Sequence, residues 1–224
     1  MKRKRSWWFG WIPAIALIVV IGGVIVATAV LINGGLAAPQ PKPTLGQVTD
    51  LNWSSFSAEG LAYIERSRDV RIDLSRGPAM ASGLGLADDA VLTIGPSDNF
   101  DTDNEYYLIV NGGGEGYGGA KFTAGQVSIT TADGIVALIR TQALASVPFR
   151  NAYNELLGEV DKFGWPEPDT DALFAQVEQA TRDGVPHEFS FGPGDRLGMI
   201  VTGTARCEPT GFCIVEYEVA PPIG

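Results

Sequence analysis

The longest hydrophobic run of the chain lies near its N-terminus. Residues 12–32 are 21 consecutive residues without a charged side chain. At ~1.5 Å per residue, a helix of this length covers about 30 Å, the thickness of the hydrocarbon core of a bilayer. Trp7, Trp8 and Trp11 precede the run, and such amphipathic rings favour the headgroup region. The pattern predicts one transmembrane helix over residues 12–34, which would contact the lipid bilayer.

The basic residues 2–5 precede the tryptophans and favour a cytoplasmic N-terminus. Residues 1–11 then form a short basic cytoplasmic tail, and the remainder of the chain faces outward. A cleaved signal peptide is the alternative, although its apolar region normally has only about 7–15 residues. Cleavage after Ala37 gives the better match to a small-x-small site. Both interpretations export the body of the protein.

Proline alternates with other residues after the hydrophobic run, at Pro39, Pro41 and Pro43. This spacing favours an extended polyproline II spacer over residues 35–47. The spacer separates the membrane segment from residues 48–224, whose length suits one folded domain.

Within this domain, one alternating run and several runs rich in β-branched or aromatic residues predict strands. Two β-favouring runs flank Asp133-Gly134, a pair suited to the positive φ angles of a tight hairpin turn. Phe56, Leu61 and Ile64 indicate one short helix. The other strands predicted in this part of the chain are residues 70–74, 90–95 and 105–111.

Hydrophobic positions then recur at helical spacing over residues 148–163, and Gly164 suits the end of that helix. A second helix is predicted to begin at Asp169 or Thr170 and to end at Gly184. The two helices should pack against a sheet as a helical hairpin. Three further strands are predicted in the tail, at residues 187–191, 197–206 and 212–219.

Strands and helices thus occur in separate blocks, without regular alternation of strand and helix. Such an order is typical of the α+β class with a largely antiparallel sheet. The sequence therefore predicts an α+β ectodomain, in which a helical hairpin packs on that sheet, after one N-terminal transmembrane helix.

Charge is distributed unevenly along the chain. The formal net charge is −10, whereas residues 42–224 hold 12 basic and 26 acidic residues, a net of −14. Affinity for nucleic acid depends on contacts from Lys and Arg to phosphate. The acidic domain therefore argues against nucleic acid as a partner and favours cations or a basic partner.

Cys207 and Cys213 flank a predicted turn at residues 208–212. The turn places them opposite each other across a hairpin, within the Cα spacing of a disulfide. Disulfides persist in exported domains. A zinc site would need shorter spacing and two further ligands. We therefore predict a disulfide that locks the tip of the hairpin.

Residues 111–121 are rich in glycine and contain a G-x-G-x-x-G spacing. A dinucleotide site needs a helix after these glycines, whereas residues 121–131 have the pattern of strands. The spacing of a phosphate-binding P-loop fails as well, because Ala120 precedes Lys121 where glycine is required. The segment predicts a surface loop and no nucleotide site.

Hard oxygen ligands gather at Asp98, Asp101, Asp103 and Glu105. Calcium prefers such ligands, so these four residues are a candidate calcium site. They do not form an EF-hand, because Tyr106 stands where that loop requires glycine. An acidic turn without a metal is the alternative, and no other cofactor is predicted.

Catalytic signals are few, and we assign no catalytic residue. His187 is the only histidine, so any serine triad would need it, and no G-x-S-x-G sequence is present. We expect His187 to be a surface or capping residue. Carboxylate pairs suited to glycoside hydrolysis are not marked by any spacing. Trp53, Trp165 and Tyr117 are candidate sugar-stacking rings, with anchoring in the core or a loop as the alternative.

These patterns predict a single-pass, membrane-anchored protein of the cell envelope with an extracytoplasmic C-terminal domain. Its acidic domain is expected to be a non-enzymatic binding or assembly module, and its partner an envelope protein or a wall polymer. One alternative is a carboxylate-based cell-wall or glycan hydrolase. The other is a secreted binding protein, released by signal cleavage.

Overall fold

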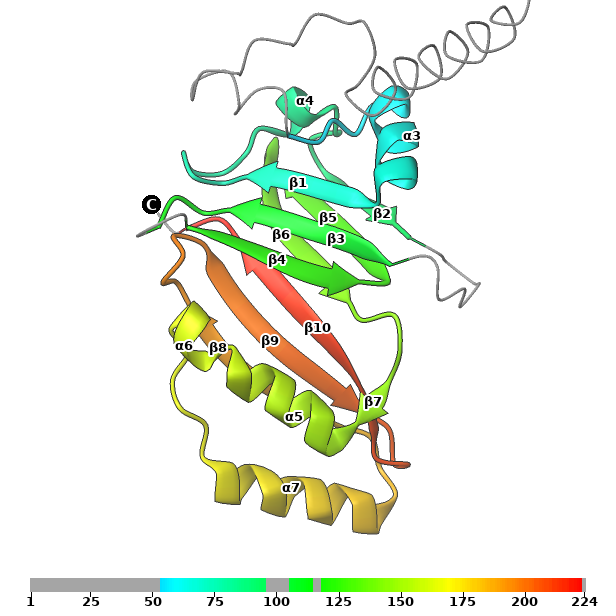
Figure 1. Cartoon of the computed structure of the whole chain (residues 1–224), viewed down its shortest axis with the longest axis vertical. Coiled ribbons are helices and arrows are strands. Elements are labelled where there is room, and N and C mark those ends of the chain that lie inside the picture. The colour runs from blue at the N-terminus through cyan, green and yellow to red at the C-terminus, as the bar shows by residue number, and fades with distance from the viewer. Residues whose placement is uncertain (1–52, 96–104, 115–117, 223–224) are drawn as a thin grey trace, which may run out of the picture. The chain divides into compact units, whose positions relative to one another are not determined.

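The computed structural model describes residues 53–95, 105–114 and 118–222 (Figure 1). The chain divides into two units, residues 1–48 and 49–224, and the described residues belong to the second unit. The predicted cytoplasmic tail, transmembrane helix and spacer lie outside the described residues. No helix in the described part is long and apolar enough to cross a membrane.

Helices and strands occur mostly in blocks along the described chain, as the sequence predicts, but a short helix at residues 81–84 that was not predicted separates the first two strands. The helices are α3 (Ala58–Ser67), α4 (Ala81–Leu84), α5 (Phe149–Gly158), α6 (Val160–Phe163) and α7 (Thr170–Asp183). The strands are β1 (Asp69–Asp73), β2 (Ala90–Ile94), β3 (Tyr106–Asn111), β4 (Gly119–Ala124), β5 (Gln126–Ala132), β6 (Ile135–Gln142), β7 (Val147–Pro148), β8 (His187–Gly194), β9 (Ile200–Cys207) and β10 (Phe212–Ala220).

The strands pair into two sheets. The large sheet has seven strands in the order β2-β5-β6-β10-β9-β8, with β7 paired to β10, and its pairings are antiparallel. The small sheet has the order β1-β3-β4, and its β1–β3 pairing is parallel. The predicted α+β fold with a largely antiparallel sheet is confirmed for the described residues.

The hairpin predicted around Asp133-Gly134 joins β5 to β6. Asp133 has φ 52° and Gly134 has φ 75°, so both central residues adopt the positive angles that this tight turn requires. Ala132 pairs with Ile135 across the turn. The hairpin prediction is therefore confirmed.

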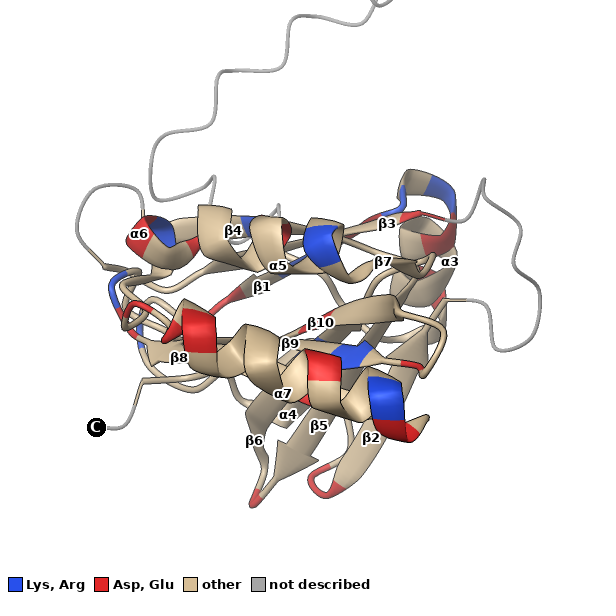
Figure 2. Ribbon diagram, turned by 90° about the horizontal axis from the view of Figure 1, so that it is seen from below, with Lys and Arg blue, Asp and Glu red and all other residues tan. Residues whose placement is uncertain are grey.

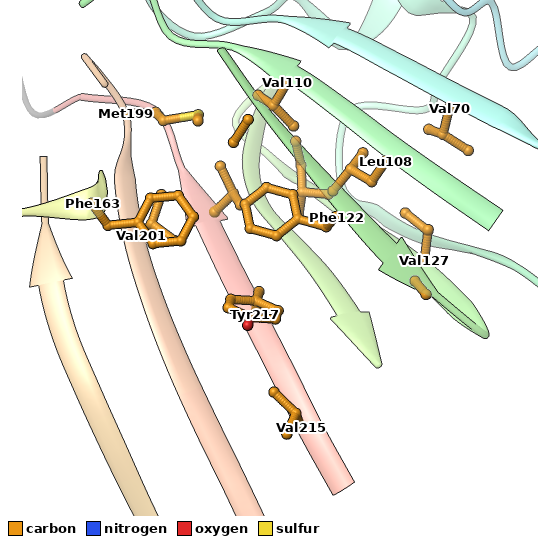
Figure 3. Packing of buried hydrophobic residues seen from close by; sticks show 14 of the residues in the cluster. Val70, Leu108, Val110, Phe122, Val127, Phe163, Met199, Val201, Val215 and Tyr217 are labelled. Atoms are coloured by element: carbon orange, nitrogen blue, oxygen red, sulfur yellow. The ribbon is translucent and has the colours of Figure 1, made fainter. Parts of the chain in front are cut away.

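The small sheet, α5 and α6 form one layer, and the large sheet forms the other (Figure 2). A hydrophobic core fills the space between them (Figure 3). Phe122 of β4 lies near its centre, with its ring centroid 5.8 Å from that of Phe163 and 5.1 Å from that of Tyr217. Full burial of one such side chain contributes ~1.5–3 kcal/mol to stability. Fully buried core residues from both sheets include Val70, Leu108, Val110, Val127 and Val201.

The helix predicted over residues 148–163 is divided at Glu159 into α5 and α6. Gly164 ends α6 in a left-handed conformation, as predicted. The second helix, α7, begins at the predicted cap, where the Asp169 carboxylate accepts a hydrogen bond from the Ala172 N–H at 3.0 Å. The prediction for the first helix therefore gives its end at Gly164 but misses the break at Glu159, and the prediction for the second helix gives both of its ends.

The two parts of the predicted helical hairpin contact the sheet unequally. Helix α5 packs against β9 and β10, whereas α7 has no buried residue and contacts β8. The Phe174 ring of α7 packs edge-on against Phe149 and Tyr153 of α5, with centroid distances of 5.3 and 5.2 Å. These aromatic contacts hold α7 beside β8, the edge strand of the large sheet.

Candidate functional site

The face of the large sheet that points away from the core is here called the outer face. The small sheet, α5 and α6 all pack on the opposite side, and no described layer covers the outer face (Figure 2). Side chains alternate along a strand, so Val215 and Tyr217 of β10 enter the core while Glu216 and Glu218 lie on the outer face. The outer face is therefore accessible in the described part of the chain.

Charged side chains mark this face. Strands β6, β8, β9 and β10 and the tip between β9 and β10 carry four glutamates and two arginines: Glu188, Glu208, Glu216, Glu218, Arg140 and Arg206. Arg140 donates its Nε–H to Glu218 at 3.0 Å, and Arg206 donates its Nε–H to Glu188 at 2.9 Å. The ion pairs leave an excess of two negative charges on this part of the described surface.

A hollow of about 600 Å³ opens at one end of this surface. We call it the sheet groove; its lining residues are Gln142, Ser146, Arg206, Glu208, Thr210, Phe212, Ile214 and Glu216. Its volume lies within the range of ordinary ligand pockets, roughly 300–1,000 Å³. Phe212 is 49% exposed, whereas Glu216 is only 6% exposed. The groove therefore combines an exposed aromatic ring with a buried carboxylate.

Arg206 connects the groove to the rest of the outer face. Its hydrogen bond to Glu188 raises the pKa of its guanidinium, and the charge of Glu216 raises this pKa further. The distance from Arg206 Nη1 to Glu216 Oε1 is 3.5 Å, which is long for a hydrogen bond. Arg206 thus binds Glu188 more closely than Glu216.

The predicted disulfide is present and supports the rim of the sheet groove. Cys207 and Cys213 are register partners on β9 and β10, their Cα atoms are 3.9 Å apart, and both side chains are buried. The tip that they close also accepts a hydrogen bond, from the Phe149 N–H to the Gly211 carbonyl at 2.9 Å. The disulfide therefore holds the segment that carries the groove residues Glu208, Thr210 and Phe212.

A second hollow, of about 260 Å³, lies between α3 and β1. Trp53 and the exposed ring of Tyr63 line it together with Asp69 and Arg71, which form an ion pair at 2.8 Å. The Trp53 indole N–H is buried and has no hydrogen-bond partner among the described residues. Of the two candidate sugar-stacking rings that the structure describes, Trp53 thus lines a hollow.

The other two candidate sugar-stacking rings are Trp165 and Tyr117. Trp165 is 4% exposed and donates its indole N–H to the Val201 carbonyl at 2.8 Å, so it belongs to the core. Tyr117 lies outside the described residues. Trp165 is therefore anchored in the core, which was the alternative interpretation for these rings.

The candidate calcium site falls almost entirely outside the described residues. Asp98, Asp101 and Asp103 are not described, and the Glu105 carboxylate accepts a hydrogen bond from the Tyr107 hydroxyl at 3.2 Å. The charge of Glu105 raises the pKa of Tyr107. Within the described ranges, no three His, Cys, Asp or Glu side chains are placed to hold a metal together. The calcium site remains a prediction.

The glycines next to β3 serve close packing of the backbone. A Cβ atom on Gly112 would lie 2.3 Å from the Leu197 carbonyl oxygen, and one on Gly114 would lie 2.4 Å from the Leu197 carbonyl carbon. The Gly114 N–H donates to the Leu197 carbonyl at 3.0 Å. Gly112 and Gly114 are therefore packed against the β8–β9 connection, which accounts for these two glycines without a phosphate ligand.

His187 is half-buried, and its ring centroid lies 6.4 Å from that of Phe149. Neither ring nitrogen has a hydrogen-bond partner among the described residues, so His187 caps no backbone group there and belongs to no triad there. Burial lowers the pKa of the ring. The capping role expected from the sequence is not found in the described part.

Glu155 of α5 is the carboxyl group with a shifted pKa in the described part of the chain. Partial burial raises this pKa, and the Glu159 charge adds to the rise, while the hydrogen bond from the Tyr217 hydroxyl at 3.1 Å lowers it. Glu155 lines neither of the two hollows. The carboxyl group whose pKa burial raises thus lies away from both hollows.

Comparison with protein families, curated proteins and solved structures found no match to this chain. The candidate site therefore rests on the geometry of the described residues.

Sequence reasoning did not single out Glu216, Arg206 or Phe212. A signal was present, since Ile214, Glu216 and Glu218 alternate with apolar residues that enter the core. Two glutamates on one side of a central strand indicate a face that is not covered by a second apolar layer.

Proposed function

We propose that this chain is a single-pass, membrane-anchored protein of the cell envelope whose exported acidic domain binds another envelope protein and performs no catalysis. The observation that carries the proposal is the outer face of the large sheet. It is free of any described covering layer, and it bears an excess of glutamate beside the sheet groove. Surfaces of this kind suit association with a basic partner.

The disulfide and the sequence of the N-terminus support the location. Disulfides form and persist in exported domains, and Cys207 and Cys213 are paired here. The uncharged residues 12–32 and the preceding basic cluster favour a membrane anchor with the domain outside. A mature chain that begins near Ala38 or Pro39 in N-terminal sequencing would instead favour the secreted form.

The hydrolase alternative lacks a comparable observation. A glycosidase needs two carboxyl groups on either side of the bond that it cleaves. Two carboxylates, Glu208 and Glu216, line the sheet groove, but Glu216 is paired with Arg206 there. Glu155, whose pKa is raised, lies outside both hollows. The geometry of the described residues therefore favours binding over this reaction.

Photo-crosslinking on intact cells tests the proposal. A photoreactive residue at Thr204, on the outer face, should capture a protein with a basic or mixed-charge ectodomain. The same residue at Thr181, on the exposed side of α7, should not. Capture at Thr204 should weaken with salt, because the Debye length falls from ~10 Å at 0.1 M to ~3 Å at 1 M. Turnover of a wall glycan by the purified protein, abolished by one Asp or Glu substitution, would overturn the proposal.

A further inference from the structure

Glu216 forms the floor of the sheet groove and lacks a close partner. It is 6% exposed, and a buried carboxylate costs free energy unless a positive charge or hydrogen-bond donors compensate it. Within the described residues its ion-pair partner is Arg206, at 3.5 Å. Because Arg206 donates at 2.9 Å to Glu188, the charge of Glu216 is only partly compensated.

The walls of the groove offer contacts of a different kind. Phe212 and Ile214 lie on the same side of β10 as Glu216 and present apolar surface. Gln142, the register partner of Glu216 on β6, supplies a neutral polar group. Glu208 adds a second carboxylate at the rim, on the tip that the disulfide closes. The groove therefore has apolar sides, an acidic floor and an acidic rim.

We propose that the sheet groove binds one lysine or arginine side chain of a protein partner. The inference rests on the proposed function, because it names the contact by which the binding domain holds that partner. The apolar stem of such a side chain packs on Phe212 and Ile214, and its charged end pairs with Glu216. A cation near the face of the Phe212 ring gains a further attraction.

Other occupants fit this groove less well. An anion would meet the carboxylates of Glu208 and Glu216. A neutral apolar group would cover Glu216 without compensating its charge. A second copy of the chain would bring another acidic outer face against this one, and like charges in contact are unfavourable. The chain's own basic residues 2–5 lie across the membrane in the proposed topology.

An NMR titration of the full-length protein in lipid nanodiscs tests this contact. The probe is the peptide acetyl-Ser-Val-Lys-Val-Ser-amide, and its control carries norleucine, which has an apolar side chain without the charge, in place of lysine. The Ile214 methyl signals report on the groove wall. At low ionic strength the lysine peptide should shift these signals to saturation, and the norleucine peptide should leave them unchanged.

Matched substitutions on the outer face separate the groove from the general charge of the sheet. Glu216→Gln should weaken binding of the lysine peptide about tenfold. Arg206→Gln should strengthen it severalfold, since Arg206 competes for Glu216. Glu218→Gln and Arg140→Gln make the same charge changes outside the groove and should change the affinity less than about twofold, as expected for rim charges.

Three results would overturn the inference. The first is an Ile214 signal that the lysine peptide does not move, or that the norleucine peptide moves equally. The second is an equal loss of affinity in Glu216→Gln and Glu218→Gln. The third is a groove already filled by residues 2–5, shown by Ile214 shifts when those residues are replaced by Gln. If the peptide fails while crosslinks from Thr204 still form on cells, the groove assignment is wrong and the binding function stands; if both fail, the function is wrong too.

Discussion

His187 couples the stability of the domain to pH. Its pKa is lowered by burial from an ordinary value of 6.5, and it is the only histidine of the chain. Below pH 6.5 the unfolded chain therefore binds a proton that the folded ring binds less readily, so the stability that His187 contributes is lost as the pH falls. We expect the drop in thermal midpoint between pH 7.5 and pH 5 to be smaller in His187→Phe than in the native protein. An identical drop in both proteins would show that His187 is not the cause.

Gly112 is required because the Leu197 backbone lies too close to it for a side chain, and not because of its conformational freedom. Gly112→Ala would place a Cβ 2.3 Å from the Leu197 carbonyl oxygen, whereas a Cβ on Gly158 of α5 meets nothing within 4 Å. We expect Gly112→Ala to lower the free energy of unfolding by ~1–3 kcal/mol. Gly158→Ala, the matched control, should raise it by ~0.5–1 kcal/mol. Chemical denaturation measures both changes, and equal effects would contradict the described packing.

The disulfide stabilises the hairpin between β9 and β10, which also forms the rim of the groove. Replacing both buried cysteines, Cys207 and Cys213, with Ala should lower the free energy of unfolding by ~2 kcal/mol, because the bridge closes a short loop. The loss should be visible in chemical denaturation of the oxidised protein against the variant. Intact mass after alkylation should show two thiols only in the reduced protein. Free thiols in the unreduced protein would contradict the assignment.

Much of the order of strands and helices could be predicted from local patterns. The β-favouring runs around Asp133-Gly134 give the β5–β6 hairpin, and Asp169 and Gly184 give the ends of α7. The break between α5 and α6 at Glu159 and the short strand β7 were not predicted. The parallel pairing of β1 with β3 was missed as well. The pairings of β7 with β10 and of β1 with β3 depend on contacts between distant segments, which hydrophobic periodicity does not report.

The division of the domain into two layers determines which charges are available to a partner. The net charge of −14 over residues 42–224 could be read from the sequence, but its distribution over the surface could not. The sheet groove draws its residues from β6, β9, β10 and the loops beside them, so no local motif contains it. The disulfide was predictable because its two cysteines are close in the sequence and flank a turn.

The central claim is that the partner binds the outer face of the large sheet. Two threonines offer a matched test: Thr202 lies on the outer face of β9, beside Glu218, and Thr123 is exposed on β4 of the small sheet. Each substitution, Thr202→Lys and Thr123→Lys, adds one positive charge to a strand. The measurement is the yield of partner captured on intact cells. We expect Thr202→Lys to reduce this yield about tenfold and Thr123→Lys to leave it unchanged. An equal yield from both variants, or a loss confined to Thr123→Lys, would contradict the claim.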